Sequence, residues 1–342
     1  MNGTDNIDCN IDQLKKWLPP SPPFLKKLMS HILNDKEPSI GTFVLRKYIQ
    51  FIKSYLPTIC DTHDQNVAAK NISSGLGFFC GSMVYILHFE NSFEHIEDIC
   101  LYNILYILVD NYIDDAQLDR VERKKGIQLM YSLLEDPFQN LESHHSFFNI
   151  IAKVYRQMIT RCPQVKNKMY KLFQTEIDGL KIQDNGDLTR DEYYNIAIKK
   201  GIYTIDVLRK ITGSTCKKIK EASRNLGVIT QLLDDSLDVF DDQRNGIHTI
   251  ATYEKKNHAT LDALWMDIAK RINDIPPNFN VFKLIYGAFA VYLPDRQSEI
   301  YSKNIRNMTT SHNLFDYKCG CDAENLLITT IIDELNIEDA SS

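Results

Sequence analysis

The chain has 342 residues, of which 44% are hydrophobic, and its 39 Lys and Arg against 45 Asp and Glu give a formal net charge of −6. This apolar content is enough for a folded core and excludes disorder of the whole chain. A negative chain without a block of basic residues argues against nucleic acid as the main partner, because binding to a phosphate backbone needs clustered cations.

The first seventeen residues (MNGTDNIDCNIDQLKKW) contain neither a basic segment nor an apolar one, so no secretory signal is expected. We therefore expect a cytoplasmic protein whose eight cysteines are reduced and serve as small apolar residues. Residues 71–89 form an uncharged stretch close to the length of a membrane span. Its three glycines and several polar side chains favour a buried helix, so no membrane span is expected.

Helices are expected to dominate, because Gly and Pro are few and no run of alternating strand residues is present. Apolar residues recur at helical spacing in residues 101–108, 147–169 and 226–237. The pattern predicts about ten helices in one all-α domain over residues 23–335, with a flexible tail at 1–22 and a polar tail at 336–342. Helix ends are expected at residues 19–23, Pro57, Asp136-Pro137, Pro163, Asn185-Gly186, Asn245-Gly246, Pro276-Pro277 and Pro294.

Two groups of aspartates stand in apolar helical segments. Asp110 and Asp114 follow the run LYNILYILV, while Asp234, Asp238 and Asp242 repeat at every fourth position. On a helix this spacing puts the carboxylates of each group on one face, where they repel unless a cation binds. Carboxylate oxygens suit Mg²⁺, which keeps water ligands and bridges to phosphate oxygens. For either group alone, a solvated acidic face is the alternative.

The segment LGVITQLLDDSLDV, from Leu226 to Val239, resembles the Gly-x-x-x-Gln-x-x-Asp-Asp-x-x-Asp segment of trans-prenyl diphosphate synthases, most closely the geranylgeranyl diphosphate branch. The resemblance covers about residues 65–300 and implies the all-α class I isoprenoid synthase fold and a homodimer. Further landmarks in the family's order are Asp110-x-x-x-Asp114, Glu192-Tyr193, Lys199-Lys200-Gly201, Tyr253-Glu254-Lys255 and Thr260 to Trp265.

In that superfamily three Mg²⁺ ions, for which Mn²⁺ can substitute, hold the diphosphate of an allylic substrate while it ionises to a carbocation. The resemblance implies two groups of site residues in this chain. The metal ligands are Asp110, Asp114, Asp234, Asp238 and Asp242, of which the first three are also the candidate catalytic residues; the residues that would contact diphosphate are Lys200, Gln231 and Lys255.

A chain-elongating synthase also binds isopentenyl diphosphate through a Gly-Gly-Lys-x-x-Arg segment, a His before the first aspartate motif and an Arg-Arg-Gly after it. In this chain Lys70 is kept, Ser73 replaces the arginine and Asn103 stands at the His position. Arg120 is the arginine left after the first motif, unless residues 123–126 take its place. Each charge-assisted hydrogen bond lost is worth about 1.5–3 kcal/mol, so the isopentenyl site is expected to be eroded.

Tyr102 and Tyr106 lie eight and four residues before Asp110, on the same helix face. Bulk at this place limits chain length in the related synthases, which favours farnesyl diphosphate as substrate. Aromatic faces can also stabilise a carbocation, although plain core packing is the alternative.

The first hypothesis is a Mg²⁺-dependent terpene synthase that converts farnesyl diphosphate to a sesquiterpene and diphosphate. The second is a divergent farnesyl or geranylgeranyl diphosphate synthase that uses Lys70, Arg120 and residues 123–125. The third is a catalytically weak partner subunit of an active synthase. Asn111, which replaces an aspartate of the first motif, fits this third hypothesis, whereas the two kept carboxylate groups argue against it.

Overall fold

The computed structural model describes residues 40–65, 67–68, 82, 94–113, 120–139, 146–185, 188–276 and 280–310. Every regular element in these ranges is a helix, which confirms the all-α prediction. The helices fall into two compact units, and each unit is described by itself. The single domain over 23–335 stays a prediction, and the two expected tails lie outside the described residues.

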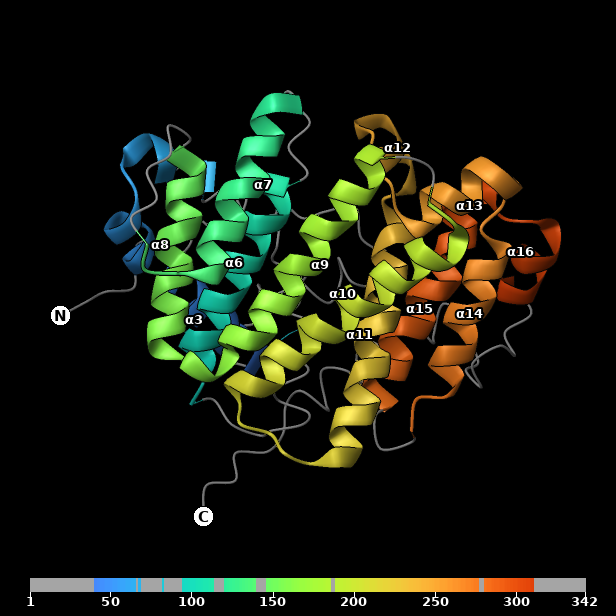
Figure 1. Cartoon of the computed structure of the whole chain (residues 1–342). Coiled ribbons are helices and arrows are strands. Elements are labelled where there is room, and N and C mark those ends of the chain that lie inside the picture. Colours follow the sequence, from blue (N-terminus) through green and yellow to red (C-terminus); the bar gives the residue numbers. More distant parts are fainter. Residues whose placement is uncertain are drawn as a thin grey trace, which may run out of the picture. The chain divides into compact units, whose positions relative to one another are not determined.

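Unit 1 is built around one helix that is buried on nearly all sides. It contains α3 (Ile40–Ile59), α6 (Ile96–Ile113), α7 (Arg120–Glu135) and α8 (Ser146–Arg161). Helix α6 is apolar around its whole circumference, as expected of a helix enclosed by neighbours, and α3, α7 and α8 pack against it (Figure 1). The ring of Tyr112 near its end contacts Phe147 and Phe148 of α8.

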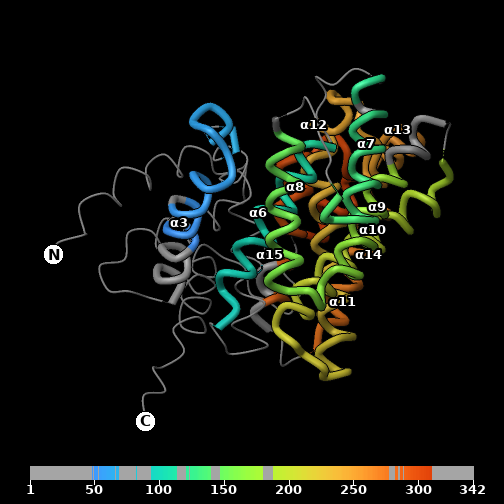
Figure 2. Tube along the Cα trace, turned by 60° about the vertical axis from the view of Figure 1, so that its left-hand side comes forward, coloured from blue at the N-terminus to red at the C-terminus, as the bar shows by residue number. Residues whose placement is uncertain are grey.

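Unit 2 contains the remaining helices. They are α9 (Lys166–Asn185), α10 (Arg190–Ile211), α11 (Lys217–Leu237), α12 (Val239–Asn245), α13 (Ile250–His258), α14 (Asp262–Asn273), α15 (Asn280–Arg296) and α16 (Lys303–Thr310). Short 3-10 turns at Pro163–Val165 and Ser298–Ile300 precede α9 and α16. Helices α9, α10 and α11 run side by side in alternating directions, with α10 between the other two (Figure 2). Helices α13, α14 and α15 pack on α11, and the buried Trp265 of α14 donates its indole N–H to the carbonyl of Ala290 on α15 at 2.7 Å.

Two glycines fix the distance between α10 and α11. A Cβ added to Gly201 would collide with the backbone of Gly227, and one added to Gly227 would collide with the backbone of Gly201. The two helices cross in backbone contact, so neither position tolerates a side chain. The glycine of the Gly-x-x-x-Gln segment in α11 is Gly227, and this close crossing is the physical reason for a glycine there.

Within the described residues, the expected helix ends agree with the structure to within about three residues, and the end expected at residues 19–23 lies outside them. Helix α7 ends just before Asp136-Pro137, α9 ends at Asn185, and α12 is closed by Gly246 with a φ of 70°. Helices α3 and α15 run through Pro57 and Pro294 and end two residues later, because a proline in the last turn removes only one hydrogen-bond donor. Twelve α-helices have both ends inside the described ranges, whereas about ten were expected for the whole chain.

No described helix is long and apolar enough to cross a membrane. Of the expected buried helix at residues 71–89, only Ser82 belongs to the described part of the chain. Cys60, Cys100, Cys162 and Cys216 are free thiols, as expected for these four. Cys100 and Cys162 are buried like small apolar residues, whereas Cys216 is exposed.

Candidate functional site

The aspartates of the second group follow one helical face across the junction of α11 and α12. Asp238 ends α11 and immediately precedes α12. Its N–H donates to the carbonyl of Asp234 at 3.1 Å, and the N–H of Asp242 donates to the carbonyl of Asp238 at 2.8 Å. Helical hydrogen bonding therefore continues through the junction and keeps the three aspartates in register. Asp234 and Asp238 are exposed, and Asp242 is half-buried.

Behind this face, Asp235 points into unit 2. Gln231 and Asp235 are each only 6% exposed, and Nε2 of Gln231 donates to Oδ1 of Asp235 at 2.8 Å. Gln231 was predicted to contact diphosphate; in the structure its amide holds the buried carboxylate one helical turn further on. Asp235 is a member of the site that the sequence reasoning missed. The signal was available, because Asp235 is the second aspartate of the Asp-Asp pair in the segment quoted above and stands four residues after Gln231.

Lys200 lies on α10 beside the glycine crossing. Its Nζ is 3.1 Å from Oε2 of Glu176 on α9, and both side chains are largely buried. Lys200 is therefore engaged between two helices, and its contact with diphosphate stays a prediction. Because it precedes Gly201, its backbone position is fixed by the contact with Gly227.

Lys255 of α13 contacts α12, the short helix that carries Asp242. Its Nζ is 2.7 Å from Oε1 of Gln243 and 3.7 Å from the centre of the Phe240 ring, both on α12. Burial lowers the pKa of Lys255, and the negative charge of Glu299 opposes that shift. The structure therefore brings a half-buried cation to the helix at the end of the aspartate face.

Helix α13 is anchored to α10 by contacts that sequence reasoning did not find. The carboxylate of Glu254 is almost fully buried, and its Oε1 is 2.6 Å from Nε of Arg190 at the start of α10. The rings of Tyr193 and Tyr253 lie 5.5 Å apart between the same two helices. Arg190 and Glu254 are 64 residues apart, so no local pattern indicates this pair.

The first aspartate group lies in unit 1 and is described only in part. Asp110 and Asn111 are half-buried near the end of α6, whereas Asp114 lies outside the described residues. Tyr102 is fully buried and Tyr106 is half-buried, with ring centres 6.2 Å apart. The two rings are neighbours on α6, as their spacing predicts, and their part in lining a substrate cavity stays a prediction.

Among the candidates for an isopentenyl site, Lys124 and Lys125 are exposed on α7. The third candidate whose side chain is described is Asn103. It is fully buried in α6, where Nδ2 donates to the carbonyl of Ile99 at 2.8 Å and Oδ1 accepts from Ser82 at 3.4 Å. Its polar atoms are thus engaged inside unit 1. The side chains of Lys70, Ser73 and Arg120 lie outside the described part of the chain.

The donors on α11 and α12 suit a hard divalent cation. Within the described ranges, no group of three or more His, Cys, Asp or Glu is arranged to hold a metal ion. Magnesium is usually held by one or two carboxylates, with water and substrate phosphate completing its six positions. The exposed Asp234 and Asp238 supply such oxygen donors, so this face fits Mg²⁺ or Mn²⁺.

Comparison with known proteins adds no assignment. No protein-family model matches the chain, and no curated protein matches it. The function is therefore inferred from the sequence motifs and from the side chains described above.

Proposed function

We propose that the chain is a magnesium-dependent class I terpene synthase that ionises farnesyl diphosphate and releases diphosphate and a sesquiterpene. One observation carries the proposal. Asp234 and Asp238 are exposed on one face that continues through the α11–α12 junction, and Lys255 is fixed against α12 at the end of that face. Carboxylates and a positioned lysine together are the groups that bind a metal and a diphosphate.

Each residue would have a separate part in the ionisation. Asp234 and Asp238 would hold magnesium, which when bound supplies a Lewis acid that stabilises charge on the departing diphosphate. Lys255 would donate hydrogen bonds to that diphosphate. Because Gln243 and Phe240 already hold its ammonium group, little reorganisation is needed as negative charge develops. The carbon–oxygen bond breaks with its electron pair on the diphosphate, which leaves an allylic carbocation.

The runner-up is a chain-elongating prenyl diphosphate synthase. The burial of Asn103 supports the terpene synthase over this alternative, because a side chain bonded to Ile99 and Ser82 is not free to bind a second diphosphate. The third hypothesis, a weakly active partner subunit of an active synthase, does not require an intact metal site in this chain.

A product assay separates the three readings. Purified protein is incubated with Mg²⁺ and farnesyl diphosphate, with and without isopentenyl diphosphate. Hexane extracts and phosphatase-treated aqueous phases are then analysed by gas chromatography with mass detection. We expect a volatile terpene from farnesyl diphosphate alone. Geranylgeraniol that forms only with isopentenyl diphosphate would establish the runner-up, and no product in either arm would favour the partner subunit.

A matched pair of variants tests the metal assignment in the same assay. Asp234→Asn is expected to abolish turnover, whereas Glu221→Gln should leave it within about twofold of the wild type. Glu221 is an exposed carboxylate on the same helix, thirteen residues before Asp234, and pairs loosely with Lys217 at 3.9 Å, so the two changes alter charge equally. Full activity in Asp234→Asn would show that the metal assignment is wrong.

A further inference from the structure

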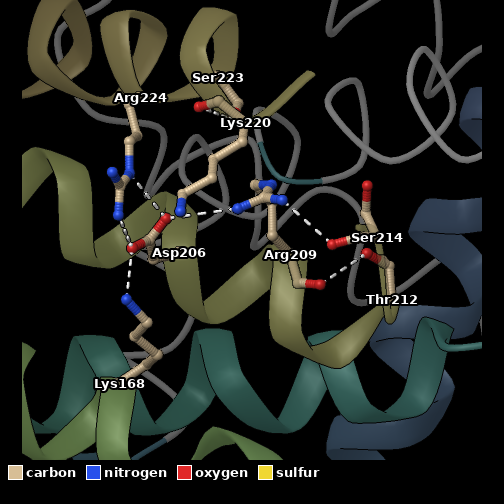
Figure 3. Close-up of polar contacts among 8 residues, drawn as sticks. All are labelled: Lys168, Asp206, Arg209, Thr212, Ser214, Lys220, Ser223 and Arg224. Atoms are coloured by element: carbon tan, nitrogen blue, oxygen red, sulfur yellow. Dashed lines mark hydrogen bonds and ion pairs between the residues drawn. The ribbon is translucent and has the colours of Figure 1, made fainter. Parts of the chain in front are cut away.

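One buried carboxylate in unit 2 is surrounded by cations from three helices. Asp206 of α10 has a side chain only 1% exposed. Its Oδ2 is 2.6 Å from Nζ of Lys168 on α9 and 2.6 Å from Nη2 of Arg224 on α11. Nη1 of Arg209 lies 3.6 Å from Oδ1, and Figure 3 shows Lys220 pointing toward the same carboxylate from α11. We call Lys168, Arg209, Lys220 and Arg224 the basic cluster.

The basic cluster carries more positive charge than Asp206 can neutralise. Three cations, Lys168, Arg209 and Arg224, lie within 3.6 Å of one carboxylate, which leaves two positive charges in excess before Lys220 is counted. Helices α9 and α11 both begin at this end of unit 2, and neither has an acidic residue in its first turn. Because a helix N-terminus carries partial positive charge, the basic side chains there repel it, and a bound anion would relieve that repulsion.

Arg209 gives independent evidence that an anion belongs here. The residue is only 8% exposed, and Nη2 donates to the carbonyl of Ser214 at 3.1 Å. Its Nε has no hydrogen-bond partner among the described residues. Figure 3 shows this guanidinium inside the cluster, between Asp206 and Ser214. Buried guanidinium N–H groups are rarely left unpaired, so the geometry favours an acceptor from outside the chain.

We propose that the basic cluster binds phosphate or diphosphate from solution and that this binding needs no metal ion. Arginines bind such oxyanions through two parallel hydrogen bonds, and lysines add point charges. The site is separate from the aspartate face, because Arg224 precedes Asp234 by ten residues, which is about 15 Å along α11. The proposal does not rest on the terpene synthase assignment.

Calorimetric titration of the whole protein with inorganic diphosphate, in low salt with EDTA present, tests this site. EDTA removes the metal ions that an aspartate site would need, so binding under these conditions reports on the cations. We expect the wild type to bind diphosphate more tightly than inorganic phosphate. Lys220→Gln should weaken diphosphate binding about tenfold, the usual worth of one charge-assisted hydrogen bond.

Lys217→Gln is the matched control, and we expect it to change affinity by less than about twofold. Lys217 lies in the same first turn of α11, is 87% exposed and pairs loosely with Glu221 at 3.9 Å. Arg209→Lys keeps the charge but removes Nε, so it should weaken binding several-fold. Circular dichroism of each variant shows whether it is folded.

Three results would each overturn the proposal. They are no binding of diphosphate at millimolar concentration, equal weakening by Lys220→Gln and Lys217→Gln, and binding that appears only with Mg²⁺ or disappears in Asp234→Asn. The titration measures binding and not turnover. A negative result would therefore overturn the anion site without bearing on the proposed terpene synthase activity, which the product assay tests.

Discussion

Asp206 shows how a carboxylate stays ionised inside a helical unit. Burial by itself raises the pKa of Asp206, but hydrogen bonds from Arg224 and Lys168 outweigh it and hold the pKa below its ordinary value of 3.8. The same contact raises the pKa of Arg224, which therefore keeps its charge. The ion pairs thus link α9, α10 and α11 through one side chain.

Asp206→Asn is expected to lower the free energy of unfolding by about 3 kcal/mol at pH 7, because it leaves half-buried cations without their carboxylate. The pKa of Asp206 is depressed in the folded state, so its contribution is complete above pH 3.8 and is lost as the pH falls through the folded pKa. Urea unfolding at pH 7 and at pH 3 should show the difference between variant and wild type shrinking in acid. A difference of equal size at both pH values would contradict this account, and the exposed Asp241→Asn should show little difference at either pH.

At the scale of helices, the crossing of α10 and α11 positions the candidate site. Gly201 and Gly227 meet backbone to backbone, with Lys200 next to one glycine and Asp234 two turns beyond the other. Any side chain at the crossing must push the helices apart, because the atoms that it meets belong to the backbone. The distance between these two helices therefore affects both stability and the site.

Gly227→Ala is expected to destabilise the protein by about 3 kcal/mol, the upper end for overpacking, and to lower turnover in whatever remains folded. Gly179→Ala on α9 is the matched control, since its Cβ would meet only Ile196 at an ordinary 3.6 Å. That control should stabilise the protein by about 0.5–1 kcal/mol, because alanine favours a helix more than glycine does. Thermal and urea unfolding measure both, and equal effects of the two changes would disprove the close crossing.

Over the whole molecule, the candidate metal ligands are divided between the two compact units. Asp110 belongs to unit 1, whereas Asp234 and Asp238 belong to unit 2. The family resemblance implies metal ligands in both units, whereas the α11–α12 face described above belongs to unit 2 alone. Activity measurements on unit 1 variants can therefore distinguish these cases.

Asp110→Asn is expected to reduce kcat/KM for farnesyl diphosphate about a thousandfold, a loss of roughly 4 kcal/mol of transition-state stabilisation. Glu97→Gln on the same helix is the control, because Glu97 is exposed and forms only a surface ion pair with Arg161. The measurement is initial rate against Mg²⁺ and substrate concentration. Wild-type kinetics in Asp110→Asn would remove α6 from the proposed site.

The sequence by itself determined the features that depend on neighbours a few residues apart. Helical periodicity and turn residues predicted an all-α protein and most helix ends, because backbone hydrogen bonds and capping are local. The four-residue spacing of Asp234, Asp238 and Asp242 predicted a shared face, and the backbone bonds across the α11–α12 junction preserve it.

Only the tertiary structure decided which side chains meet across helices. Asp206 lies 38 residues from Lys168 and 18 from Arg224, and the pair Arg190–Glu254 is 64 residues apart. It also decided that Gln231 serves a buried carboxylate and that Lys200 pairs with Glu176. Such contacts depend on which helices pack together and at what distance, and a close crossing like that of Gly201 and Gly227 is set by three-dimensional packing that local periodicity does not encode.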